Sequence, residues 1–154
     1  MQNKGISKGL LFAGLLLFGN LVAQEYVVRK DNKIIQDNGL ISGTLELEND
    51  SFKTVSLQYI DGVREEFMLG SNDFSFTAND KYYTGSSGWI LDDIQSQTDD
   101  SEGEGVKITL VEMASPSELQ LEIFYLLYPD LPLIRKWIQF TNKGHGEIML
   151  ELIF

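Results

Sequence analysis

Apolar and polar residues alternate along most of the chain after residue 25, and this period of two predicts β-strands. In residues 52–60, for example, Val55, Leu57 and Tyr59 share one face while polar residues occupy the positions between them. Turn-forming pairs such as Asp61-Gly62 separate these segments. We expect about ten or eleven strands, over residues 26–30, 33–36, 40–47, 52–60, 74–77, 81–84, 90–96, 106–113, 119–128, 133–142 and 147–153.

The segment from Leu119 to Met149 carries the strongest strand signal. Two long apolar runs flank a Pro-Asp-Leu-Pro turn, and a glycine-containing turn leads into a third run. Pro129 and Pro132 fix φ and lack a backbone donor, so we expect the strand ladder to stop at them. The preceding strand has the same character, because Val106, Ile108 and Leu110 share one face.

This pattern predicts an all-β fold, an antiparallel β-sandwich, because many short strands alternate with turns and no segment has a helical period. We find no internal repeat and no interdomain linker, so one domain is expected over residues 24–154. The sequence ends at Phe154 inside an alternating apolar run. We therefore expect the domain to be truncated at its C-terminal end, since an unfinished strand edge favours aggregation.

The N-terminus predicts a bacterial secretory signal peptide over residues 1–23. Lys4 and Lys8 precede an apolar core of ten residues, GLLFAGLLLF, which is short for a membrane span. The small residue Ala23 favours cleavage between Ala23 and Gln24. The alternative is an uncleaved anchor. With cleavage, the mature protein is secreted or periplasmic and has no membrane segment.

The charge balance argues against nucleic acid and anionic membranes as partners. The chain has a net charge of −11, from 12 basic and 23 acidic residues among 154. Such a surface repels phosphate backbones; it suits a neutral ligand, and it also suits solubility alone. The absence of cysteine excludes disulfides, thiolate metal sites and cysteine nucleophiles.

Candidate catalytic chemistry is sparse. A phosphate-binding glycine loop is absent, and His145, the single histidine, lies in a predicted turn, so neither a metal nor another cofactor is expected. Carboxylates are frequent, as in Glu65-Glu66 and Asp92-Asp93, but each pair is explained by a solvated turn or strand. We therefore assign no catalytic residue in this chain.

Three aromatic residues beside a Gly-Ser-Ser-Gly loop are candidates for sugar contact. Tyr82, Tyr83 and Trp89 could stack their rings against the C–H faces of a sugar. The alternative is that Trp89 and one tyrosine fill the core between two sheets, because large aromatic side chains are highly buried on average.

One motif resembles a known family. The run from Tyr128 through Asp130 and Leu133-Ile134 to Arg135, followed by Asn142 and Gly144, resembles the N-terminal domain of glycoside hydrolase family 36, the α-galactosidases and their relatives. The early strands, from Asn38-Gly39-Leu40 to Phe74-Ser75-Phe76, are similar to that domain in a less specific way.

The resemblance implies a β-supersandwich of the galactose mutarotase type that precedes a catalytic (β/α)₈ barrel. Both catalytic aspartates of the family lie on that barrel, so this chain alone is expected to be inactive. The motif residues Tyr128, Asp130, Arg135, Asn142 and Gly144 are expected to be structural, with Arg135 pairing with Asp130 or another acid. In the family, this domain can also contribute to the active-site rim or to a homo-oligomer interface.

Three hypotheses follow. The first is a non-catalytic N-terminal domain of an exported α-galactosidase-like hydrolase that acts on galactosides, with its own catalytic domain as a partner. The second is a stand-alone carbohydrate-binding or adhesion sandwich. The third is a surface structural domain that contacts only its own neighbours.

Overall fold

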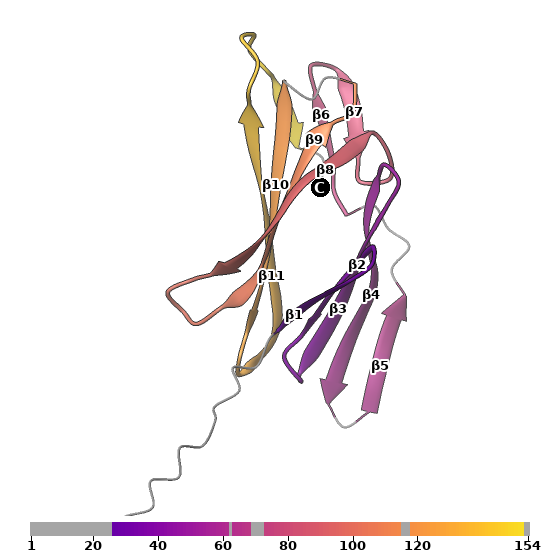
Figure 1. Cartoon of the computed structure of the whole chain (residues 1–154), viewed down its shortest axis with the longest axis vertical. Helices are drawn as coiled ribbons and strands as arrows, with labels where there is room; N and C mark the ends of the chain where they lie inside the picture. The colour runs from indigo at the N-terminus through magenta and orange to yellow at the C-terminus, as the bar shows by residue number, and fades with distance from the viewer. Residues whose placement is uncertain (1–25, 62, 69–72, 115–117, 153–154) are drawn as a thin grey trace, which may run out of the picture.

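The computed structural model describes residues 26–61, 63–68, 73–114 and 118–152, and within them the chain is entirely β (Figure 1). The strands are β1 (Val27–Lys30), β2 (Lys33–Asp37), β3 (Ile41–Glu48), β4 (Ser51–Asp61), β5 (Val63–Met68), β6 (Ser75–Ala78), β7 (Lys81–Thr84), β8 (Trp89–Thr98), β9 (Glu104–Glu112), β10 (Leu119–Tyr128), β11 (Leu131–Asn142) and β12 (Leu150–Leu152). No helix in this part of the chain could span a membrane.

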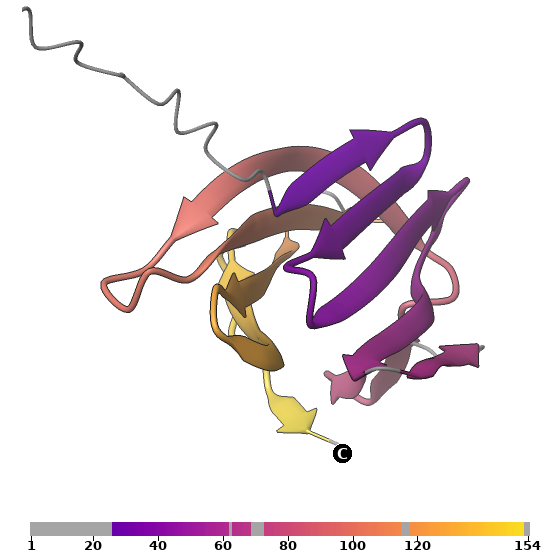
Figure 2. The ribbon, with the colours of Figure 1, turned by 90° about the horizontal axis from the view of Figure 1, so that it is seen from below.

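The strands form three antiparallel sheets, which confirms the predicted all-β sandwich class. The five-stranded sheet is a meander in the order β1-β2-β3-β4-β5, and the long sheet has the order β11-β10-β9-β8. A small sheet of order β12-β6-β7 lies beside the upper end of the long sheet in Figure 1. The view from below shows β8 curving strongly around the other strands (Figure 2).

The inner face of the long sheet carries the hydrophobic core. Alternate residues of β10, from Leu119 to Leu127, are buried on this face, as the period of two predicts. Aliphatic side chains from β2 and β3, such as Ile34 and Leu45, belong to the same core cluster. At the other end the core is aromatic, because the ring of Phe76 of β6 packs edge-on against Phe140 of β11, with 4.8 Å between the ring centroids. The five-stranded sheet and the small sheet therefore contribute to the same core as the long sheet.

Strand β4 contains a bulge, so the side chains of its N-terminal half lie on the opposite faces from those that simple alternation predicts. Leu45 pairs with Thr54, whereas Gly43 pairs with Leu57, so the register shifts at Val55. One extra residue reverses the facing of every side chain that precedes it. Thr54 therefore shares a face with Leu57, although simple alternation places it on the opposite side.

The structure adds one strand and lengthens another. β5 was not predicted, and its pairing with β4 extends the meander. Strand β11 begins at Leu131 and contains Pro132, although we expected the ladder to stop there. Tyr128 pairs with Leu131 and Leu127 with Ile134, so Pro132 lies in a register shift of an edge strand, where a missing donor is tolerated.

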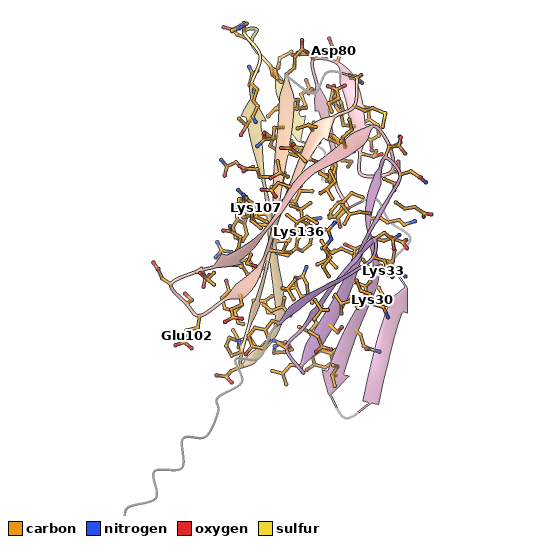
Figure 3. The ribbon with its side chains drawn as sticks, viewed as in Figure 1. Lys30, Lys33, Asp80, Glu102, Lys107 and Lys136 are labelled. Carbon is orange, nitrogen blue, oxygen red and sulfur yellow. The ribbon has the colours of Figure 1, made fainter. Side chains whose placement is uncertain are left out.

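A polar cluster joins all three parts of the molecule. Tyr125 of β10 and Thr54 of β4 donate hydrogen bonds to the two carboxylate oxygens of Asp73, which precedes β6. Lys136 of β11 lies 2.8 Å from the same carboxylate and is labelled near the centre of the molecule in Figure 3. The buried charge of Asp73 thus has partners from both large sheets.

The signal peptide, with its cleavage between Ala23 and Gln24, lies outside the described residues and remains a prediction.

Candidate functional site

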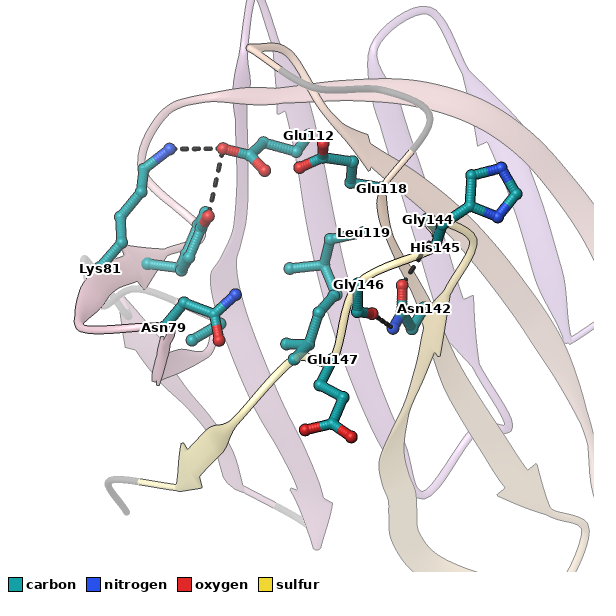
Figure 4. Close-up of a pocket in the computed structure, with 13 residues that line it drawn as sticks. Asn79, Lys81, Glu112, Glu118, Leu119, Asn142, Gly144, His145, Gly146 and Glu147 are labelled. Carbon is teal, nitrogen blue, oxygen red and sulfur yellow. Dashed lines mark hydrogen bonds and ion pairs between the residues drawn. The ribbon is translucent and has the colours of Figure 1, made fainter.

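Two surface depressions meet at one group of side chains, formed by Lys81, Tyr83 and Glu112. The first, which we call the Tyr82 depression, has a volume of about 420 Å³ and is also lined by Tyr82, Thr84, Ser87, Gly88, Met113 and Ala114. The second, which we call the Asn142 depression, has a volume of about 250 Å³ and is shown in Figure 4. Its other lining residues include Asn79, Glu118, Asn142, His145 and Glu147.

Glu112 is the centre of this group. Its side chain is only 8% exposed, and its Oε1 accepts hydrogen bonds from the ammonium group of Lys81 and, at 3.2 Å, from the hydroxyl group of Tyr83 (Figure 4). The Lys81 ammonium group also lies 4.7 Å from the centroid of the Tyr83 ring, where a cation–π attraction operates. Burying a carboxylate is costly unless it has such partners.

These contacts change the proton affinity of both donors. The hydrogen bond to Glu112 raises the pKa of Lys81 above its usual value of 10.5. Burial, followed by the nearby charge of Glu112, raises the pKa of Tyr83 above its usual value of 10.0. Lys81 is therefore a cation and Tyr83 a neutral donor at neutral pH.

The end of β9 and the hairpin of β6 and β7 bring this group together. Glu112 is the last residue of β9 and pairs with Trp89, while Lys81 and Tyr83 lie on β7. Tyr83 is fixed by its ring, which stacks on Phe76 at a centroid distance of 5.0 Å. Gly88, with a φ of 89°, provides the turn that leads into Trp89, a backbone conformation that favours glycine.

The three predicted sugar-contact residues lie close together but differ in exposure. Tyr82 is 57% exposed and lines its depression, whereas Tyr83 is half-buried. Trp89 is only 2% exposed, and its indole N–H donates to the Thr84 carbonyl at 2.8 Å. Trp89 thus belongs to the core, packed edge-on to Phe74, and its ring is not available for stacking on a sugar.

Two residues of the resemblance motif converge on a third that the motif does not include. The Tyr128 hydroxyl donates to Oδ2 of Asp99 at 2.9 Å, and Arg135 lies 3.8 Å from the same oxygen. Asp99 is in the loop between β8 and β9, so the contact joins two hairpins. Asp130 lies exposed in the turn between β10 and β11.

The other two motif residues shape the turn after β11. The side-chain amide of Asn142 donates to the Gly146 carbonyl at 2.6 Å, and its oxygen accepts from the Gly144 amide at 3.0 Å. This is a local turn held by an Asn side chain, as the sequence predicts. It also places Asn142 and Gly144 on the wall of the Asn142 depression.

Sequence reasoning missed Glu112, Lys81 and Asn79 as site residues. A signal for Glu112 was present, because it continues the inward series of Val106, Ile108 and Leu110. A carboxylate at a core-facing position requires a partner. Lys81 of β7 and Asn79 of the turn before it have no comparable signal, since their proximity to Glu112 depends on how the small sheet packs against the long sheet.

The remaining carboxylates do not assemble into a metal site within the described residues, since no group of three suitable ligands occurs there. Asp93 is exposed and bonded to Gln95. The side chains of Glu65 and Glu66 lie outside the described part.

In comparisons with known proteins, no family model, curated protein or solved structure matches this chain.

Proposed function

We propose that this chain is the non-catalytic N-terminal β-sandwich domain of an exported α-galactosidase-like glycoside hydrolase. In this proposal, the catalytic barrel belongs to a part of the protein that the present chain does not contain. That barrel cleaves galactosides with a pair of carboxylates, as retaining glycosidases do. The domain described here supplies a rigid neighbour for the barrel.

The observation that carries the proposal is the convergence of Tyr128 and Arg135 on Asp99. These two motif residues join two hairpins of the sandwich, and Asn142 holds the next turn. The residues that give the chain its resemblance to the family thus serve the fold of the domain. This structural role supports a resemblance to the non-catalytic N-terminal domain of the family, and it agrees with a catalytic centre located elsewhere.

The partners that follow are a galactoside-containing carbohydrate, bound by the whole enzyme, and the enzyme's own catalytic domain. A second copy of the chain is a further candidate, since the N-terminal domain can contribute to an oligomer interface in the family that this chain resembles. Secretion or a periplasmic location follows from the predicted signal peptide.

The coding DNA beyond the codon for Phe154 tests this proposal. An in-frame continuation that encodes alternating strands and helices, with an aspartate after each of two strands, is the expected result. A stop codon directly after Phe154 would contradict the proposal.

A stand-alone carbohydrate-binding sandwich is the second candidate, and the Tyr82 depression favours it. An exposed aromatic residue beside a charged pair, such as Tyr82 beside Lys81 and Glu112, can bind a sugar without a catalytic partner. The same stop codon that contradicts the first candidate would support this one.

A further inference from the structure

We propose that the Tyr82 and Asn142 depressions are two halves of one groove that binds a short, neutral oligosaccharide, with the Lys81–Glu112 pair between them. The inference concerns a binding site in this domain itself. It rests on the proposed function only for the choice of galactosides as the first ligands to test.

The first step is the apolar surface in the Tyr82 depression. Tyr82 is 57% exposed although it lines the depression together with other residues, among them the exposed Met113. Exposed apolar groups that lie together at a hollow often mark a ligand surface. A sugar ring offers a flat apolar C–H face that fits against such a ring, and a tyrosine loses little conformational entropy on contact.

The second step is the supply of hydrogen-bonding groups by Lys81 and Glu112, which line both depressions. Within the described residues, both hydrogen bonds that reach the Glu112 carboxylate end on Oε1, so Oε2 is left to accept from a ligand hydroxyl group. The Lys81 ammonium group, whose side chain is 55% exposed, keeps donors on its open side. Neighbouring hydroxyl groups of a sugar can use such a donor and acceptor together.

The third step is the lining of the Asn142 depression. Asn79 and Asn142 bring amide groups, and Glu118 brings a second carboxylate (Figure 4). Asn79 also fixes the backbone here, because its side-chain oxygen accepts from the Met149 amide at 2.9 Å. Amides and carboxylates that line a hollow match a ligand with many hydroxyl groups.

The fourth step is charge. Glu112, Glu118 and Glu147 outnumber Lys81 around the Asn142 depression, and the whole chain carries a net charge of −11. Anionic ligands such as phosphorylated or uronic acid sugars are therefore repelled. Volumes of about 250 and 420 Å³ on either side of one wall suit a chain of two or three sugar units better than a single large ligand.

A titration of the chain followed by NMR tests the groove. The ligands are methyl α-galactoside, an α-1,6-linked galactosyl-glucose disaccharide and a glucose disaccharide. We expect saturable shifts of backbone signals at Tyr82, Lys81 and Glu112, and stronger binding of a disaccharide than of methyl α-galactoside. Absence of saturable shifts with all three ligands would overturn the inference.

Variants of exposed tyrosines make the test specific. Tyr82→Ala should weaken binding about tenfold, and Tyr82→Phe should preserve it, because the ring and not the hydroxyl group provides the contact. Tyr59→Ala, which removes an exposed tyrosine from β4, is the matched control and should leave binding unchanged. Equal affinities for Tyr82→Ala and the unmodified chain would overturn the inference.

The outcome separates this inference from the proposed function. Binding of the glucose disaccharide alone, lost in Tyr82→Ala, supports the groove and contradicts galactosides as its ligands. Tyr82-dependent binding by a chain whose reading frame stops after Phe154 supports the groove and contradicts the hydrolase as its parent.

Discussion

The ammonium group of Lys136 lies 2.8 Å from Oδ2 of Asp73, a carboxylate whose side chain is only 2% exposed. Lys136 projects from the inner face of β11, between Ile134 and Ile138, and Asp73 precedes the small sheet. The ion pair therefore links the edge of the long sheet to the segment that leads into the small sheet. The hydroxyl groups of Tyr125 and Thr54 donate hydrogen bonds to the same carboxylate.

Lys136→Met should destabilise the fold by about 2 kcal/mol, because it leaves the buried charge of Asp73 without its cation. The loss is smaller than for a fully buried pair, since the Lys136 side chain is 30% exposed. Urea unfolding measures it. Lys143→Met, at an exposed lysine in the turn after β11, is the control and should change stability little. Equal unfolding midpoints for Lys136→Met and the unmodified chain would contradict this account.

Tyr125→Phe should alter the response of stability to alkaline pH. Burial and the Asp73 carboxylate raise the pKa of Tyr125 well above its usual value of 10.0. A pKa raised by folding stabilises the protein below pH 10, and this contribution is lost progressively as the pH rises above 10. Urea unfolding from pH 8 to 11 should show a steeper decline for the unmodified chain than for Tyr125→Phe. Parallel declines would show that Tyr125 does not contribute.

Asn38→Asp should loosen the turn at the Pro-Asp-Leu-Pro segment. The side-chain amide of Asn38 donates to the carbonyl groups of Tyr128 at 2.6 Å and Leu131 at 2.8 Å. A carboxylate of the same shape cannot donate and repels both oxygens, which should cost about 2 kcal/mol at neutral pH. Part of this loss should return at acidic pH, where the introduced group is protonated and can donate. Thermal unfolding measures both effects, with Asn32→Asp, at an exposed turn residue, as the control. A loss that is the same at both pH values would argue against the contact.

Tyr128→Phe should raise the pKa of Asp99. Hydrogen bonds from the Gly103 backbone amide and from the Tyr128 hydroxyl group hold the pKa of Asp99 below its usual value of 3.8. Removal of the hydroxyl group should move the pKa toward that value, while the backbone amides keep it lowered. Carboxyl NMR signals followed against pH measure this change. An unchanged pKa in Tyr128→Phe would mean that the motif tyrosine does not act on Asp99.

The alternation of residues was enough to predict most strands, because each strand has one face on a common core. It failed for β5, since Val-Arg-Glu-Glu-Phe-Met has no period of two and its pairing depends on β4. It also could not show the bulge at Val55, which depends on how β4 pairs with β3. The division into three sheets depends on contacts between distant strands.

Only parts of the candidate site could be predicted. Tyr82, Tyr83 and Trp89 were proposed because exposed aromatic rings can stack on sugars, but the exposure that distinguishes Tyr82 from Trp89 depends on the packing of the small sheet. Glu112 ends one inward apolar series and Lys136 interrupts another, and each is a member of a charged pair. A charge at a core-facing position is thus a signal in this sequence that the predictions from alternation did not use.

Hydrolysis of an aryl α-galactoside tests the central claim most directly. The protein encoded by the complete reading frame should release the aryl group, and the 154-residue chain alone should release none. Failure of the complete protein to cleave any α-galactoside, or release by the 154-residue chain alone, would contradict the assignment of this chain as a non-catalytic domain of an α-galactosidase-like hydrolase.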